Sequence, residues 1–148
     1  MSTYTQILYQ IVFSTFNHER TLSDNGRSEL SKYIWRILEN KKCHPYWING
    51  VEDHLHILTH LHPMVSLASL VKDIKLGSSD WIKRSQILPE FNGWQEGYGA
   101  FTYSYHQKDG LIEYVKNQEY HHSKKTFTQE LIDLLNEHGV AYDEKFLK

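Results

Sequence analysis

Residues 45–61 read PYWINGVEDHLHILTHL, and the expected fold follows from this stretch. Apolar and aromatic residues occupy both of its halves, which is the pattern of two strands, and Asn49-Gly50 is a typical hairpin turn signal. We therefore predict a strand over residues 45–51, a reversal of the chain at Asn49-Gly50, and a returning strand over residues 53–61 that Pro63 closes.

The segments on either side of this hairpin alternate between strand and helix patterns. A run rich in Tyr, Ile, Val and Phe predicts a first strand over residues 4–15, and Ser23 or Asp24 can cap the helix that follows it. Downstream, Ser66 caps a second long helix that Gly77 could interrupt. After it we expect an aromatic strand and two amphipathic helices, over residues 94–105, 109–123 and 127–138.

This order of elements predicts an α+β fold, a ferredoxin-like β-α-β-β-α-β sandwich with an antiparallel sheet and C-terminal helices. A length of 148 residues suits one compact unit, so we expect a single domain over residues 1–148. A fold of this kind supports many activities, and the function has to be argued from particular residues.

Composition and charge limit the classes of function. The lone Cys43 excludes an internal disulfide and argues against a multi-thiolate zinc site, so a reducing cytosol is the expected compartment. Since no apolar run approaches the roughly 20 residues of a membrane span, we expect no membrane partner. The formal net charge of −2 offers no overall positive field for nucleic acid. DNA binding would therefore need a local basic surface or a bound divalent cation.

His54 and His56 flank one residue in the returning strand of the hairpin. Side chains at positions i and i+2 project from the same face of a strand, so the two imidazoles can hold one divalent cation. Leu55 and Ile57 then point into the core. Two histidines on a solvated strand face are the simpler interpretation, and the histidines at 60 and 62, which continue the same alternation, are expected at the surface.

Tyr114, Gln118 and His121 are spaced by four and then three residues, so they share one stripe of a helix. A phenol with a pKa of about 10 is a poor nucleophile near neutrality unless a cation is close. Gln118 offers a neutral oxygen as a third ligand, which together with two imidazoles suits Mn²⁺ or Mg²⁺. His121 could replace it and would favour softer metals. A packing tyrosine beside surface polar residues is the alternative.

The two motifs in this order resemble those of the HUH single-tyrosine transposases of the smallest bacterial insertion sequences, to which the REP-associated tyrosine transposases are related. Further segments are similar to that family. They are the opening strand YQIVF, the aromatic segment WQEGYGAF, the helical run YVKNQEYHH, and the tail with Phe127, Glu130 and residues 139–143. The resemblance covers nearly the whole chain.

The resemblance implies roles for individual residues. His54 and His56 would be metal ligands, Tyr114 the nucleophile and Gln118 the third ligand. The implied activity is a metal-dependent DNA transposase of the bacterial cytoplasm. It would cleave single-stranded DNA at hairpin-bearing element ends and rejoin strands through a 5′-phosphotyrosine intermediate. The family also implies a homodimer in which the tyrosine helix of one subunit completes the site of the other.

Basic residues near the two long helices are candidate phosphate contacts, although a solvated charge is the simpler role for each: Lys41, Lys42, Lys72, Lys75, Lys83 and Arg84. Three other functions stay open. The chain could be a nickase or phosphodiesterase that does not rejoin strands, a domesticated relative that binds DNA hairpins, or an αβ domain that binds metal adventitiously. Tyr120 is the next candidate if Tyr114 is not the nucleophile.

Overall fold

A four-stranded antiparallel sheet forms the centre of the computed structural model, which describes residues 2–117 and 125–147. Its strands are β1 (Leu8–Ser14), β2 (Pro45–Val51), β3 (His54–His60) and β4 (Gly99–Tyr103). The helices are α1 (Asp24–Asn40), α2 (Leu67–Ser85), α3 (Lys108–Lys116) and α5 (Phe127–Glu137). Three short 3-10 helices lie between or after them: η1 (Phe16–His18), η2 (Tyr105–Gln107) and η3 (Glu144–Phe146).

The strand order is β2-β3-β1-β4, and every neighbouring pair is antiparallel. This is the order of the ferredoxin-like β-α-β-β-α-β plan, so the predicted fold class is confirmed. The central strands are β1 and β3, in a register that places Val12 opposite His56 and Phe13 opposite Leu55. Because β3 pairs on both edges, its side chains lie in the middle of the sheet.

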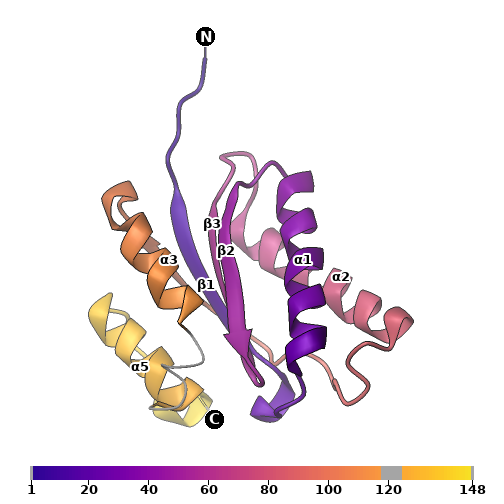
Figure 1. Cartoon of the computed structure of the whole chain (residues 1–148). Helices are drawn as coiled ribbons and strands as arrows, with labels where there is room; N and C mark the ends of the chain where they lie inside the picture. The colour runs from indigo at the N-terminus through magenta and orange to yellow at the C-terminus, as the bar shows by residue number, and fades with distance from the viewer. Residues whose placement is uncertain (1, 118–124, 148) are drawn as a thin grey trace.

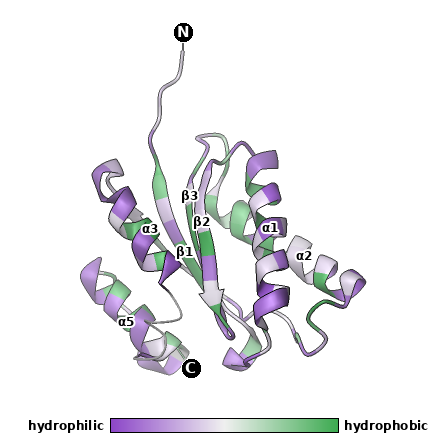
Figure 2. Cartoon of the chain, in the orientation of Figure 1, coloured by the Kyte–Doolittle hydropathy of each residue, from purple (hydrophilic) through white to green (hydrophobic). Residues whose placement is uncertain are grey.

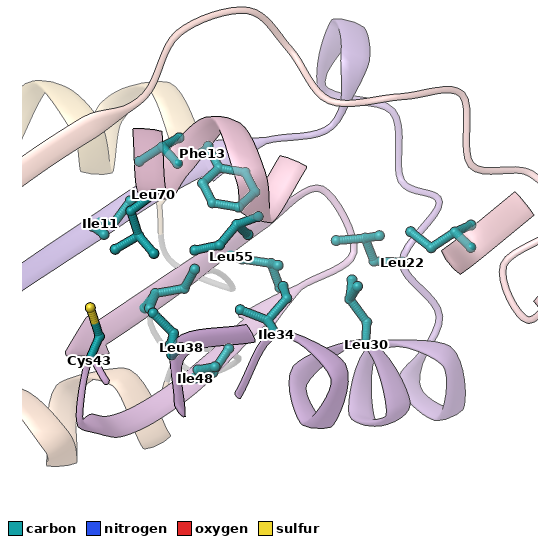
Figure 3. Packing of buried hydrophobic residues seen from close by; sticks show 14 of the residues in the cluster. Ile11, Phe13, Leu22, Leu30, Ile34, Leu38, Cys43, Ile48, Leu55 and Leu70 are labelled. Carbon is teal, nitrogen blue, oxygen red and sulfur yellow. The ribbon is translucent and has the colours of Figure 1, made fainter. Parts of the chain in front are cut away.

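One face of the sheet packs against α1 and α2, which lie on the same side of it (Figure 1). Alternate residues of the central strands fill this interface, and Ile11, Phe13, Leu55 and Ile57 are all fully buried there. Figure 3 shows several of these side chains converging with those of α1. Burial of such side chains is the main source of stability of the fold, at about 1.5–3 kcal/mol for each.

The opposite face of the sheet lies against α3 and α5 (Figure 1). Val12 and Phe101 of the sheet pack there with Phe127, Leu134 and Leu135 of α5. Figure 2 shows hydrophilic and hydrophobic residues alternating in bands along the helix ribbons, as expected for helices with one buried side. The smaller apolar cluster leaves room for polar side chains on this face. None of the described helices combines the length and the apolar character needed to cross a lipid bilayer.

The hairpin turn lies elsewhere than predicted. Asn49 and Gly50 belong to β2 and pair with His56 and Leu55, and the chain reverses at Glu52-Asp53. The prediction of a turn at Asn49-Gly50 was therefore wrong. Gly50 serves a different purpose, because a Cβ atom there would lie 2.9 Å from the Cα atom of Leu55. The glycine permits close approach of the two strands instead of a turn.

Other predicted boundaries also moved. The first strand begins at Leu8 instead of residue 4, and the aromatic segment forms a loop before β4 begins at Gly99. The second long helix runs through Gly77 without a break. Here the Ser78 hydroxyl donates to the carbonyl of Ile74 and accepts from Trp94 Nε1, which satisfies the serine inside the helix. The end predicted for the tyrosine helix, at residue 123, lies outside the described residues.

Replacement of Gly50 by alanine should destabilise the protein by about 1–3 kcal/mol, the usual effect of overpacking a closed interior. The added methyl group would collide with the backbone of β3. Urea unfolding followed by circular dichroism measures the change. Gly110→Ala is the matched control, because its Cβ atom meets nothing within 4 Å and alanine favours a helix. Equal stability of Gly50→Ala and the wild type would contradict the strand register described here.

Candidate active site

The two motif histidines of β3 lie on the face of the sheet that α3 and α5 cover, and both are buried. His54 is 0% exposed and His56 is 1% exposed, with ring centroids 5.3 Å apart. Leu55 and Ile57 point to the other face, as the alternation predicts. The histidines are therefore not residues of a solvated strand face. Imidazoles buried this deeply need polar partners inside the protein.

Asp53, in the turn that precedes β3, orients the ring of His54. Its Oδ1 atom lies 2.7 Å from His54 Nδ1. Because a carboxylate only accepts, Nδ1 carries the proton and Nε2 presents its lone pair. Burial lowers the pKa of His54 below its ordinary value, and the hydrogen bond to Asp53 opposes this shift. A neutral imidazole held by a carboxylate is the form in which histidine binds metals.

Gln10 of β1 is the corresponding partner of His56. Gln10 Nε2 lies 2.8 Å from His56 Nδ1, and the Tyr103 hydroxyl donates to Gln10 Oε1 at 2.8 Å. This chain of hydrogen bonds crosses three strands. The other ring nitrogen, His56 Nε2, contacts the carboxylate of Glu130 but makes no hydrogen bond with any residue that the structure describes. A buried nitrogen in this position fits a cation held between the ring and the carboxylate.

Glu130 of α5 is 3% exposed, and one of its carboxylate oxygens lies 4.0 Å from His54 Nε2. One ring nitrogen of His54, one of His56 and a carboxylate oxygen of Glu130 lie within 4.8 Å of one another. Two neutral nitrogens and one charged oxygen form a donor set for a divalent cation. The arrangement could hold a metal ion with three protein ligands and leave positions for other oxygen ligands.

Sequence reasoning did not name Glu130 as a ligand. It assigned the third position to Gln118 or His121, and both lie outside the described residues. The missed signal was the helical pattern of α5, because Glu130 follows Phe127 by three residues and precedes Leu134 by four, and both neighbours are buried. An acidic residue on the buried stripe of an amphipathic helix needs a partner, so its position indicates a site.

Tyr114 of α3 faces the same group of residues. Its ring centroid lies 6.0 Å from that of His56, within the same chain. Asn49 of β2 fixes this arrangement, because its Nδ2 atom donates to the carbonyls of Val115 and Lys116, each at 3.2 Å. Asn49 is also the residue that pairs with His56 across the hairpin. The hairpin register thus places the end of the tyrosine helix beside the histidines.

The phenol of Tyr114 is held in its protonated form. Burial raises its pKa above the ordinary value, and the negative charge of Glu130 and a hydrogen bond with that carboxylate raise it further. Lys125 lines the same pocket of about 270 Å³, but its ammonium group lies 2.5 Å from Asp133 Oδ2. Formation of a phenolate here therefore requires additional positive charge close to the hydroxyl.

The six basic residues considered as phosphate contacts belong to the α1–α2 layer, on the other face of the sheet. The Lys75 ammonium group donates to the carbonyls of Gln95 and Gly97 and so holds the loop before β4. Lys41 and Arg84 pair with acidic residues of α2. The remaining three are exposed: Lys42, Lys72 and Lys83. The structure does not bring any of the six to the histidine–tyrosine site.

Residues 3–118 match the sequence model of a family described as IS200-like transposase. The match spans well over half of the chain, so the protein belongs to the IS200-like transposase family. The matched range includes the paired histidines and Tyr114, and it ends before α5. Glu130 therefore comes from the part of the chain beyond the family match. No curated protein sequence matches the chain.

Two solved structures share the fold. One is a candidate transposase from Deinococcus radiodurans R1, with a TM-score of 0.63 and 20% identity over 80% of this chain and 95% of that one. The other is a REP-associated tyrosine transposase bound to a REP hairpin, with a TM-score of 0.62 and 14% identity over 82% of this chain and 74% of that one. At these identities the likeness concerns the fold.

Mn²⁺ should bind to the folded protein and raise its free energy of unfolding by about 2.7 kcal/mol when its concentration is a hundredfold above Kd. The melting temperature should rise accordingly. Glu130→Gln keeps the shape of the side chain but removes its charge, so we expect its Mn²⁺ affinity to fall at least about tenfold. Isothermal titration calorimetry measures the affinity. Glu144→Gln, an exposed change, is the control. Equal affinities of the two variants would exclude Glu130 as a ligand.

Proposed function

We propose that this chain is a metal-dependent DNA transposase that cuts and rejoins single-stranded DNA at hairpin-bearing element ends through a 5′-phosphotyrosine intermediate. Membership of the IS200-like family supports the general class. The observation that carries the mechanism is the position of the Tyr114 ring, 6.0 Å from the ring of a buried histidine pair with an adjacent carboxylate. We propose that residues 1–148 act as one endonuclease domain.

In this proposal His54, His56 and Glu130 hold one Mg²⁺ or Mn²⁺ ion. One carboxylate and two imidazoles form a ligand set that suits a divalent cation, and such a cation can also bind phosphate oxygens. When bound, such an ion supplies the positive charge that the scissile phosphate and the phenolate need. Gln118, or His121 in its place, stays a candidate for a further ligand from the tyrosine helix.

The residues of the chain position and activate the nucleophile. The Tyr114 oxygen attacks phosphorus, the bond from phosphorus to the 3′ oxygen breaks, and the leaving oxygen takes up a proton to become a free 3′-OH. The carboxylate of Glu130, which is hydrogen-bonded to the phenol, would accept the phenolic proton. Attack of a 3′-OH on the phosphotyrosine reverses these steps and joins strands without a nucleotide cofactor.

A DNA hairpin is the partner that we propose, because the REP-associated relative of the same fold is bound to one. Among the six basic candidates, Lys42, Lys72 and Lys83 are exposed and make no ion pair with other described residues. We propose that they contact phosphates of the DNA away from the cleaved bond. They would supply local positive charge that the overall charge of −2 does not.

Two alternatives use the same site. A nickase would form the covalent intermediate but release it by hydrolysis, and a domesticated hairpin-binding protein would bind DNA without cutting it. The intact juxtaposition of Tyr114 and the histidine pair favours a cutting enzyme over a binding protein. A joined product, formed when a second strand with a free 3′-OH is supplied, distinguishes a transposase from a nickase.

Incubation with Mn²⁺ and single-stranded DNA that carries the hairpin-forming sequence next to the gene should give a covalent protein–DNA adduct. Tyrosine stays attached to the 5′ phosphate, so a 3′-labelled strand should label the protein on a denaturing gel and a 5′-labelled strand should not. Tyr114→Phe removes only the hydroxyl and should abolish the adduct. Tyr33→Phe, a change on α1, is the control. An adduct that survives Tyr114→Phe would assign the nucleophile to another residue, first of all Tyr120.

A mixing experiment tests whether one chain completes the site. The family resemblance predicts a homodimer with exchanged tyrosine helices, whereas Tyr114 lies beside His56 of its own chain. We therefore expect an equimolar mixture of Tyr114→Phe and His56→Ala to remain inactive in the adduct assay. Recovery of about a quarter or more of the wild-type activity would show that the two subunits share their sites.

A further inference from the structure

A groove of about 650 Å³ lies between α1 and β2, along the outer edge of the sheet. β2 is the last strand on this side of the sheet, with α1 against one of its faces and α3 against the other (Figure 1). Both faces of the strand contribute to the groove, because Ile48 packs in the core beneath α1 whereas the neighbouring Asn49 donates to α3. The volume lies within the range of about 300–1,000 Å³ that is usual for ligand pockets.

Two tryptophans line this groove, Trp35 of α1 and Trp47 of β2. Both side chains are only partly buried. Indoles are among the largest hydrophobic side chains, so indole surface that faces an open groove is a favourable place for another flat, apolar group. Unpaired nucleobases are such groups, and they stack on aromatic side chains in proteins that bind single-stranded nucleic acids.

The charged residues that line the groove favour an anionic ligand. They are Arg27, Lys32 and Asp24, two cations and one anion, in a chain whose formal net charge is −2. Arg27 is held by Asp24 and by a backbone carbonyl, so Lys32 is the cation best placed to meet a ligand. Lys32 forms an ion pair with Glu29 at 3.4 Å, but both side chains are exposed and such pairs contribute little. A phosphate can therefore compete for the lysine.

The groove adjoins the tyrosine helix through two contacts. Asn49 lines the groove and donates to the carbonyl of Lys116 in the last turn of α3. The ammonium group of the same lysine lies over the ring of Trp47, 4.7 Å from its centroid. Lys116 follows Tyr114 by two residues, and its ion pair with exposed Glu113 is long, at 3.9 Å. A single strand bound at Tyr114 can therefore continue over Trp47 with a phosphate beside Lys116.

The outer edge of β2 pairs with no other strand among the described residues. Its outward backbone N–H and C=O groups, together with the hydroxyls of Ser28 and Ser31, offer hydrogen bonds to the edges of bases. A strand from a second copy of the chain is the other occupant that such an edge suggests. An added strand is held by main-chain hydrogen bonds and does not need cations or exposed indoles. The two tryptophans and the two lysines therefore favour single-stranded DNA.

We propose that the groove between α1 and the outer edge of β2 binds unpaired nucleobases of the DNA strand that continues from the cleaved phosphate. The bases stack on Trp35 and Trp47, and Lys32 and Lys116 contact the phosphates that join them. The proposal rests on the proposed function, because single-stranded DNA is the substrate there, and it adds a subsite for bases beyond the cleaved bond. Stacking accepts every base, so this subsite provides affinity and directs the path of the strand.

An oligothymidylate of eight nucleotides tests the groove, because a base stacked on an indole quenches its fluorescence. We expect the wild type to bind this probe with quenching of tryptophan fluorescence. An oligonucleotide of the same length made of abasic nucleotides keeps the phosphates but lacks the bases. It should bind at least about fivefold more weakly and without quenching. Equal affinities for the two probes, or no binding of oligothymidylate, would overturn the proposal.

Substitutions in the groove locate the stacked bases. Trp35→Leu and Trp47→Leu should each weaken oligothymidylate binding by about 5- to 150-fold, the loss of one stacked base, and leave abasic binding unchanged. Trp81→Leu is the matched control, because this indole stacks on Tyr33 and does not line the groove. Ser31→Leu fills the groove without removing an aromatic side chain, which keeps the test valid if circular dichroism shows that a tryptophan variant is unfolded. Wild-type affinity in folded Ser31→Leu and Trp35→Leu would overturn the proposal.

The dependence of binding on salt separates stacking from phosphate contacts. For a single strand, each phosphate contact contributes about 0.7 to the slope of log affinity against log salt concentration. Lys32→Met and Lys116→Met should each lower this slope by about 0.7, whereas Trp35→Leu should leave it unchanged. A slope that neither lysine substitution alters would remove both lysines from the proposed subsite.

The adduct assay distinguishes failure of this proposal from failure of the proposed function. If the wild type forms the Tyr114 adduct, but Trp35→Leu and Trp47→Leu bind oligothymidylate as the wild type does, the base subsite is wrong and the proposed function stands. If these variants instead change the oligomeric state in analytical ultracentrifugation and not the DNA affinity, a second copy occupies the groove and the proposal is also wrong. If the wild type binds oligothymidylate with quenching but forms no adduct, the groove is supported and the proposed function fails.

Discussion

The pairing of β2 with β3 is the constraint on which the rest of the structure depends. It sets Asn49 opposite His56, and from that position Asn49 holds the carbonyl end of α3. The same pairing sends Leu55 into the main core and both histidines to the other face. A slip of β3 by one residue would turn Leu55 away from the core and move the histidines away from the tyrosine helix. Burial of the apolar side chains therefore fixes the register, and the register in turn fixes the position of the site.

Burial gives the site its electrostatic character. Burial away from water lowers the pKa of His54 and raises that of Tyr114, so it favours the neutral form of both groups. Glu130 instead introduces a negative charge into the interior, and a buried charge is costly unless a partner compensates it. An ion between Glu130 and the two rings would relieve this charge and lower the cost of forming a phenolate. The same residues thus favour metal binding and make the nucleophile dependent on it.

The sequence alone predicted the order of the elements, the fold class and the two faces of the histidine strand, because hydrophobic alternation and helical spacing are local properties. It placed the hairpin turn wrongly at Asn49-Gly50, since a glycine that permits close strand approach looks the same as one that permits a turn. Glu130 and Gln10 were not assigned roles, because their proximity to His56 arises only when α5 and β1 pack against β3. Gln118 and His121 lie outside the described residues, so their roles stay predictions.

The account depends most on a divalent cation held jointly by His54, His56 and Glu130 beside Tyr114. Anomalous diffraction from crystals soaked in Mn²⁺ tests this directly. We expect one strong peak bounded by Nε2 of both histidines and the carboxylate of Glu130, on the side of the site that the tyrosine ring faces. A peak elsewhere in the molecule, with none between the two imidazoles at saturating Mn²⁺, would contradict the central claim.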